Sequence, residues 1–155
     1  MLAAICALGL FAACEKEQAG DGSDGTYAVT VGDVTVELGK KAEPVLEALG
    51  APQSKQSTGN CGGLGESVRY EYPEFVMVVV DYEDGDKIID QLELKNDGAE
   101  TAGGIYIGSA EADVRAKYGE PDGENGRAIT YENEEMLLQF GISDGVVSAI
   151  VLRCK

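Results

Sequence analysis

The stretch that decides the fold runs Ile107-Gly108-Ser109-Ala110-Glu111-Ala112-Asp113-Val114-Arg115-Ala116-Lys117-Tyr118-Gly119-Glu120-Pro121. An earlier stretch repeats its pattern, from Leu38-Gly39-Lys40 through Val45 to Leu49-Gly50-Ala51-Pro52. In both copies the two glycines are eleven residues apart, a valine stands six residues after the first glycine, and a proline follows the second glycine by two. The chain therefore contains an internal duplication.

Each copy predicts a short helix between its two glycines. Pro44 fits the first helical turn, where a missing N–H costs nothing, and Ser109 is a good N-cap residue. Gly50 and Gly119 are typical helix stops, and the prolines that follow them prevent the helix from continuing. The apolar stripes at helical spacing are Val45, Leu46 and Leu49 in the first copy and Ala110, Val114 and Tyr118 in the second.

Strands are predicted on both sides of each helix. A hairpin over 27–38 turns at Gly32-Asp33, in the order that a type II′ turn prefers. A polar, glycine-rich loop is expected over 53–66, a polar connector over 96–103, a short strand over 104–107 and a turn over 122–126. Asp84-Gly85 and Asp144-Gly145 are predicted hairpin turns at equivalent places in the two units. The remaining strands are expected at 68–72, 75–80 and 88–94, and at 129–131, 136–140 and 146–152.

Each unit thus reads as one strand, one helix and three antiparallel strands, with the first repeat at 27–97 and the second at 98–155. A single unit of this size buries too little apolar surface to be stable alone. We therefore expect an α+β fold, in which the two tandem strand-helix-three-strand repeats form one antiparallel sheet of about eight strands with the helices packed on one face. The other face of the sheet is expected to be open.

The amino-acid composition argues against several classes of function. The chain of 155 residues carries 28 acidic and 12 basic side chains, a net charge of −16, and no histidine. This charge repels phosphate backbones, which argues against nucleic-acid binding, and it favours solubility or a cationic partner. Without histidine the commonest general base and transition-metal ligand are missing, so we expect no enzyme activity, no cofactor and no metal site. A carboxylate-dependent hydrolase is the remaining catalytic alternative.

The first thirteen residues form an uncharged apolar run, too short to span a bilayer. Their length and small-residue end are typical of a signal peptide. Leu10-Phe11-Ala12-Ala13-Cys14 resembles a bacterial lipobox, which predicts lipidation of Cys14 after cleavage, and 14–26 reads as a flexible acidic Gly/Ser/Asp tether. A buried apolar helix with an incidental cysteine is the alternative. We expect a lipid-anchored protein on the outer face of the membrane in the bacterial cell envelope.

The predicted anchor determines which cysteines remain to form a disulfide. Cys6 leaves with the signal peptide and Cys14 carries the lipid, so Cys61 and Cys154 remain. Two cysteines outside the cytoplasm usually pair, and a disulfide closing this long loop would stabilise the fold by about 4–5 kcal/mol. Two free thiols are the alternative.

The pattern Gly-Ser-x-x-x-Asp-Val-x-x-x-Tyr-Gly-x-Pro at 108–121 resembles the tandem repeat of the β-lactamase inhibitory protein family. It also resembles the small outer-membrane assembly lipoproteins of the BamE/SmpA group, which carry one such unit behind a lipobox. The resemblance covers most of 34–155 as two copies. It implies a protein that binds other proteins rather than catalysing a reaction, with the inhibitors using the open sheet face and its loops.

These observations predict a lipid-anchored, extracytoplasmic protein-binding module. A structural component of a cell-envelope assembly complex is the alternative. Tyrosine is favoured at protein interfaces, and Tyr82 and Tyr106 lie outside the stripes assigned to the core. We therefore expect partner contacts at Tyr82, Tyr106 and Leu64, the last of these in the 53–66 loop.

Overall fold

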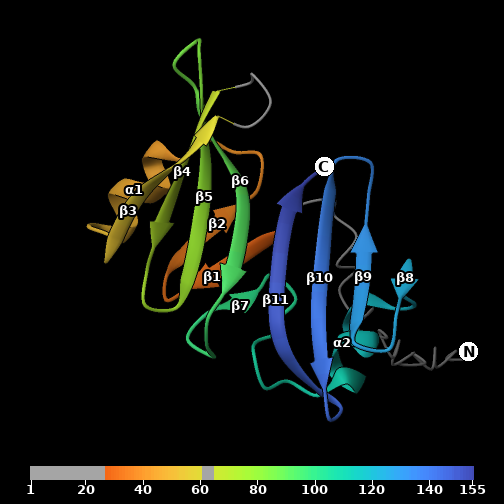
Figure 1. The fold of residues 1–155 in the computed structure, drawn as a ribbon. Coiled ribbons are helices and arrows are strands. Elements are labelled where there is room, and N and C mark those ends of the chain that lie inside the picture. The colour runs from red at the N-terminus through yellow and green to blue at the C-terminus, as the bar shows by residue number, and fades with distance from the viewer. Residues whose placement is uncertain (1–26, 61–64) are drawn as a thin grey trace, which may run out of the picture.

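The computed structural model describes residues 27–60 and 65–155. In these residues the chain forms two helices and eleven strands (Figure 1). The first unit contains β1 (Ala28–Val31), β2 (Val34–Glu37), α1 (Glu43–Leu49), β3 (Ser54–Asn60), β4 (Gly65–Glu71), β5 (Phe75–Tyr82) and β6 (Lys87–Leu94). The second contains β7 (Glu100–Thr101), α2 (Glu111–Tyr118), β8 (Gly123–Glu124), β9 (Ala128–Glu132), β10 (Met136–Ser143) and β11 (Val146–Cys154).

The described strands form two antiparallel sheets. The large sheet has eight strands in the order β3-β4-β5-β6-β11-β10-β9-β8, and the small sheet has three in the order β2-β1-β7. Each unit therefore gives four consecutive strands to the large sheet. The last strands of the two units, β6 and β11, pair antiparallel in the middle, with Leu92 opposite Leu152 and Glu93 opposite Val151. We call this pairing the seam.

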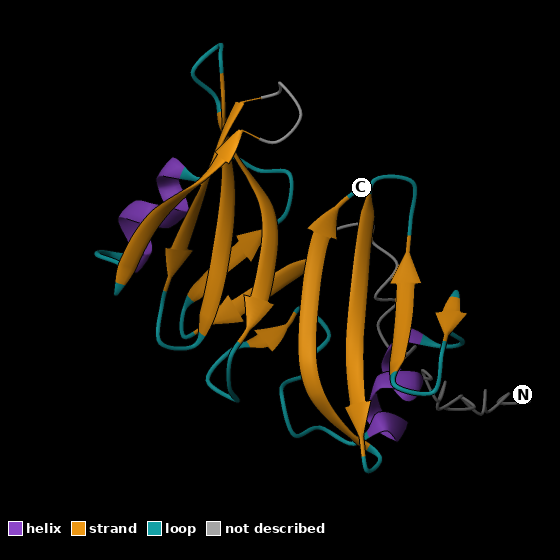
Figure 2. Cartoon of the chain, in the orientation of Figure 1, coloured by secondary structure: helices purple, strands orange, loops and turns teal. Residues whose placement is uncertain are grey.

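The two sheets and the helices form two layers (Figure 2). The small sheet, α1 and α2 all lie on one side of the large sheet, and no described element covers its other side. The core fills the space between the layers. Its largest fully buried side chains are Phe75, Phe140, Leu38, Met77, Ile89, Leu92, Ile129, Leu138, Ile150, Leu152, Val29 and Val36.

The expected α+β class is wrong, because the fold is mostly β. Strands account for 52% of the structure and helices for 12%. The helices have only 7 and 8 residues, α1 has no buried residue, and α2 buries only Val114. The first hairpin instead supplies much of the covering layer, with Val29 and Val36 fully buried in the core. Short helices bury too little apolar surface to cover a sheet of this width.

The expected strand-helix-three-strand unit is also wrong. The first hairpin does not join the large sheet but pairs with β7. The 53–66 stretch, expected to be a loop, contains β3, and the expected turn at 122–126 contains β8. Residues 104–107 form no strand. Both β3 and β8 lie at sheet edges and are largely exposed, so they need no apolar alternation and leave no pattern in the sequence.

Ser109 does not cap α2. The N-cap is Ala110, which makes no side-chain capping hydrogen bond. Ser109 Oγ instead accepts a hydrogen bond from the Tyr106 backbone N–H at 3.1 Å, and the Ser109 carbonyl accepts one from Val147 N–H at 2.8 Å. Ser109 is therefore tied to β11, and the helix begins one residue later than expected.

The repeated glycines occupy equivalent places in the two units. Gly39 N–H donates to the Ile89 carbonyl in the last strand of the first unit, and Gly108 N–H donates to the Val147 carbonyl in the last strand of the second, both at 2.8 Å. Gly50 and Gly119 end their helices with φ of 72° and 80°. Only glycine adopts this conformation without strain, so these glycines are required by backbone geometry.

The three predicted hairpin turns are confirmed. Gly32-Asp33 links Val31 and Val34, which are paired, and Gly32 has a φ of 57°. Asp84-Gly85 lies in the β5–β6 turn, where Gly85 N–H donates to the Tyr82 carbonyl at 2.9 Å. Asp144-Gly145 is a two-residue turn with φ of 54° and 77°, as a type I′ turn requires.

A matched pair of tyrosines predicts equal effects in the two units. Tyr72 OH donates to the Gly50 carbonyl at 3.2 Å, and Tyr131 OH donates to the Gly119 carbonyl at 3.0 Å. Each bond holds the end of a helix against the large sheet. Tyr72→Phe and Tyr131→Phe are each expected to lower the free energy of unfolding by about 0.5–1.5 kcal/mol, as measured by urea denaturation.

Tyr70→Phe is the matched control for this pair. Tyr70 is also buried, but its hydroxyl makes no hydrogen bond with the described residues. Its loss is expected to change stability by less than about 0.5 kcal/mol. A large effect at only one of Tyr72 and Tyr131 would contradict the equivalence of the two units at this point.

Candidate functional site: the open face of the large sheet

The side of the large sheet that faces away from the small sheet is the candidate site. On β5, Phe75, Met77 and Val79 are at most 1% exposed and belong to the core. Because side chains alternate along a strand, Val76 and Val78 point to the other side. We call that side of the large sheet the open face.

Two rows of side chains cross the open face, because the strand registers align them. The first, the arginine row, contains one residue from each of six neighbouring strands, β4, β5, β6, β11, β10 and β9. The second, the glutamate row, lies next to it on the same strands. The arginine row is Arg69, Val78, Gln91, Arg153, Leu137 and Glu132, and the glutamate row is Glu71, Val76, Glu93, Val151, Gln139 and Thr130.

Ion pairs cover the apolar residues of the first unit on this face. Arg69 lies 3.9 Å from Glu93 and Lys95 lies 3.2 Å from Glu71, both reaching across β5. Val76, between the two pairs in the glutamate row, is only 2% exposed although it lies on the open face. Since the charged groups are partly exposed, each pair contributes less than about 1 kcal/mol. Long charged side chains can nevertheless cover apolar surface with their aliphatic stems while their charged ends stay in water.

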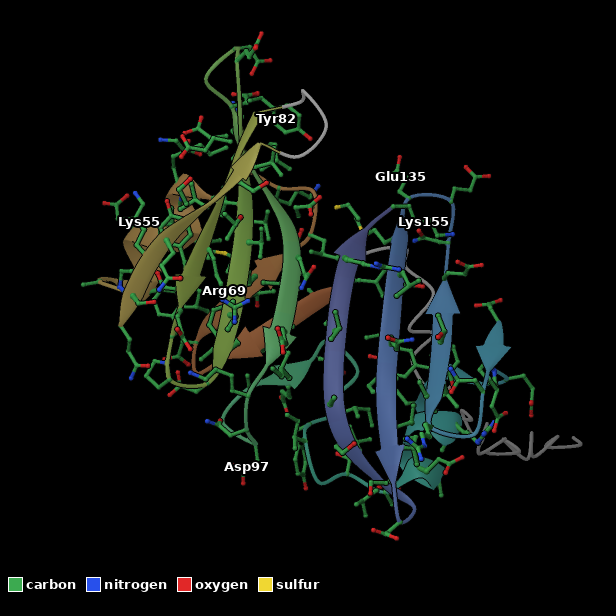
Figure 3. The ribbon with its side chains drawn as sticks, viewed as in Figure 1. Lys55, Arg69, Tyr82, Asp97, Glu135 and Lys155 are labelled. Carbon is green, nitrogen blue, oxygen red and sulfur yellow. The ribbon has the colours of Figure 1, made fainter. Side chains whose placement is uncertain are left out.

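The second unit presents a different chemistry on the same face. Lys155 pairs with Glu132 at 2.8 Å near the upper edge (Figure 3). Arg153 is exposed at the centre of the arginine row and forms no ion pair with any described residue. Its neighbours in the second unit, Leu137 and Val151, are half-buried and uncharged. A guanidinium beside apolar side chains is a common centre of protein interfaces.

The open face is close to neutral in a strongly acidic protein. Acids and bases are nearly equal in number on it, whereas the whole chain has 28 acids and 12 bases. The excess negative charge therefore lies elsewhere, so an acidic partner is repelled less at this face than at the rest of the surface. The charged residues of the open face are Arg69, Lys95, Arg153, Lys155, Glu71, Glu93, Glu132 and the bulged Asp90.

Asp90 is the extra residue of a β-bulge in β6, where the pairing with β5 shifts between Val78 and Val79. Burial raises the pKa of its carboxyl, and the charge of nearby Arg153 partly opposes that rise. Burial also raises the pKa of the neighbouring Cys154 thiol, whose Sγ lies 3.8 Å from the Ile89 carbonyl oxygen. The bulge thus places a half-buried acid at the seam.

Asp90→Asn is expected to stabilise the protein slightly at neutral pH. When the pKa of a carboxyl is higher in the folded than in the unfolded protein, the folded protein loses stability as the pH rises from the unfolded-state pKa through the folded-state pKa. The gain on removing this charge is therefore about 0.5 kcal/mol at pH 7 and absent at pH 3. Urea denaturation at the two pH values measures it, and a loss of stability at pH 7 would show that the carboxylate is stabilising.

Tyr82 and Tyr106, the two tyrosines expected to contact a partner, lie far apart in the structure. Tyr82 is half-buried and is the last residue of β5, at the upper end of the strands in Figure 3. Tyr106 is 42% exposed and lies by the opposite end, where Ser109 N–H donates to its carbonyl and Ser109 in turn pairs with the start of β11. Val146, also 42% exposed, is at this lower end too. The two tyrosines cannot belong to one small contact site.

Several predicted features lie outside the described residues. These are the signal peptide, Cys14, the tether, Cys61 and Leu64. Cys154 forms no disulfide with any described residue, and because Cys61 lies outside them, the pairing of the two stays a prediction. No helix in the described part of the chain is long and apolar enough to cross a membrane.

Alternative chemical sites receive little support from the geometry. Asp81 and Asp86 in the β5–β6 hairpin are paired with Lys87 and Lys41. Across 27–60 and 65–155, no three His, Cys, Asp or Glu side chains are grouped to hold a metal ion. A cavity of about 30 Å³ between Glu111 and Glu124 is large enough only for a few water molecules, and Arg115 binds both carboxylates, each at less than 3 Å.

Sequence reasoning missed the residues of the open face. Arg69, Glu93 and Arg153 alternate with apolar side chains in the strands expected at 68–72, 88–94 and, one residue beyond its end, 146–152, so their direction was implied by the strand pattern. Their alignment into rows depends on strand order and on the β6–β11 pairing, which the sequence alone does not specify. Comparison of the chain with protein-family models, with curated proteins and with solved structures found no match.

Proposed function

We propose that this protein is a lipid-anchored, extracytoplasmic protein-binding module that presents the open face to a protein partner. The observation that carries the proposal is the uncovered side of the eight-stranded sheet, across which two ordered rows of side chains run. Eight strands at about 4.8 Å spacing make a face about 34 Å wide. A face of that width can supply the roughly 800 Å² that one partner buries in a stable complex.

The entry point of the chain supports this orientation. Tyr27 precedes β1 in the covering layer, and its carbonyl accepts a hydrogen bond from Leu38 N–H at 3.2 Å. The pKa of the Tyr27 hydroxyl is raised by burial and by the charge of Asp122, which places the residue beside the second unit. The first described residue therefore lies in the covering layer, on the side of the large sheet away from the open face.

The sequence resemblance supports the same function. The β-lactamase inhibitory protein repeat and the BamE/SmpA-type lipoproteins both imply protein binding, and the inhibitors use an open sheet face. The lipobox-like 10–14 segment supports an anchored, extracytoplasmic location on the bacterial envelope.

Photo-crosslinking in cells tests the docking surface. A benzoylphenylalanine at Gln139, in the centre of the glutamate row, is expected to capture a discrete protein species. The matched control is the same probe at Glu47, an exposed position on α1 in the covering layer. Capture at Glu47 but not at Gln139 would move the binding surface to the covered side, and capture at neither would reject the binding function.

Membrane fractionation tests the anchor separately. Cys14→Ala is expected to release the protein from the membrane fraction, because the predicted lipid attachment is then absent. Cys6→Ala is the matched control and is expected to leave the protein in the membrane. Equal partitioning of the Cys14→Ala variant and the unaltered protein would show that Cys14 is not the anchor.

A further inference from the structure

We infer that the partner of the open face is a second copy of this chain, docked face to face about a twofold axis that runs along the seam. The inference rests on the proposed function, because both require the open face to be a docking surface. It adds the identity of the partner and the residues that meet.

The strand order makes the open face geometrically suited to such a dimer. The seam lies at the middle of the eight strands, between β6 and β11. Rotation about an axis along the seam exchanges β6 with β11, β5 with β10 and β4 with β9 of the second copy. The arginine row therefore meets the arginine row of the second copy in reverse order. Sheets packed face to face stay within about 30° of each other, so the rows overlap near the axis.

The residues that meet in the reversed arginine row are complementary. Arg69 faces Glu132 of the second copy, opposite charges at the two ends of the row. Val78 faces Leu137, and both are half-buried apolar side chains. Gln91 faces Arg153, whose guanidinium has no ion pair in the single chain and can donate to the Gln91 amide oxygen. Each contact occurs twice, because the axis is twofold.

The adjacent glutamate row is compatible with the same arrangement. Glu71 faces Thr130 of the second copy, and Val76 faces Gln139, so a hydroxyl and an amide lie near Glu71 and can donate to it. Glu93 faces Val151, but Arg69 of its own chain lies 3.9 Å away and balances that charge.

Charge also selects this face for contact between copies. Two chains of net charge −16 repel each other. On the open face acids and bases are nearly balanced, so contact there avoids concentrating like charges. At physiological ionic strength the Debye length is about 8 Å. Repulsion between the distant acidic surfaces is therefore largely screened, whereas interactions between charged residues in contact are screened much less.

Crosslinking combined with charge reversal tests the dimer in the full chain. With benzoylphenylalanine at Gln91, the expected product has twice the mass of the chain, and its crosslinked peptide contains residues near Arg153 of the second copy. Arg69→Glu and Glu132→Arg are each expected to reduce this product about tenfold or more, because each places like charges together twice per dimer. The double variant, with the charges exchanged, is expected to restore it.

Lys41→Glu is the matched control, since it breaks an exposed ion pair with Asp86 away from the open face. It is expected to leave the dimer product unchanged, and thermal unfolding verifies that every variant is folded. Capture of a different protein at Gln91, with no product of twice the mass, would overturn the second copy while leaving the proposed function in place. A dimer insensitive to both single reversals would overturn this docking geometry, and no product of any kind would overturn both proposals.

Discussion

Replacing Phe140 by alanine is expected to lower the free energy of unfolding by about 3–5 kcal/mol. Phe140 is fully buried on β10, and its ring lies 5.5 Å from that of Tyr118 and 6.1 Å from that of Tyr131. Truncation removes the ring contacts to α2 and β9 together and leaves a cavity in the core of the second unit. Urea denaturation, followed by circular dichroism, measures the change.

Gln139→Ala is the matched control, because Gln139 precedes Phe140 on the same strand and points to the open face. Its expected effect on stability is within about 0.5 kcal/mol. A loss below about 1 kcal/mol for Phe140→Ala would mean that the core collapses around the gap, which the close packing of three aromatic rings argues against.

The inward face of the large sheet was predictable from the sequence. Tyr72, Leu92 and Leu94 on the first unit, and Tyr131 and Leu138 on the second, follow the alternation from which strands were expected, and all are buried. This succeeded because a strand with one face in the core must alternate apolar and polar side chains. The repeated glycines were predictable for a similar reason, because few residues other than glycine can end a helix with positive φ.

The covering layer was not predictable in the same way. The Tyr27–Leu38 hairpin has the pattern of any half-buried hairpin, and that pattern does not specify which sheet it joins. Its actual partner is Glu100–Thr101, a two-residue strand with no apolar signature. Edge strand Ser54–Asn60 likewise has no apolar pattern that would predict a strand, because its described side chains are mostly exposed to solvent. The sequence therefore predicted too few strands, and it assigned to the two short helices a covering role that the first hairpin mostly fills.

The two units of the chain agree in the residues that face the core and differ in those that face outward. The inward residues Met77 and Leu92 of the first unit correspond to Phe140 and Ile150 of the second, and all four are apolar and fully buried. The outward residues differ in kind. Arg69, Glu71 and Glu93 correspond to Ala128, Thr130 and Val151. The core maintains one chemistry in both units, whereas these equivalent positions on the open face are charged in the first unit and uncharged in the second.

The seam is expected to make the two units unfold as one. Leu92 and Leu152 are directly opposite each other across the seam and are both fully buried. Leu92→Ala and Leu152→Ala are each expected to lower the free energy of unfolding by about 2–5 kcal/mol, although the residues belong to different units. Because the two side chains are directly paired, the double variant is expected to depart from additivity by about 0.5 kcal/mol or more.

Unfolding followed by two probes tests this cooperativity. Tyrosine fluorescence and circular dichroism are expected to give coincident denaturation curves for the unaltered protein and for each variant, since neither unit alone buries enough apolar surface to be stable. Gln91→Ala, at the seam but on the open face, is the control and is expected to change stability by less than about 0.5 kcal/mol. Two separate transitions, with Leu92→Ala shifting one and Leu152→Ala the other, would show that the units are independent domains joined only by strand pairing. A single shifted transition would mean that the eight-stranded surface exists only when both units are folded, so that any partner of the open face binds, and stabilises, the whole molecule.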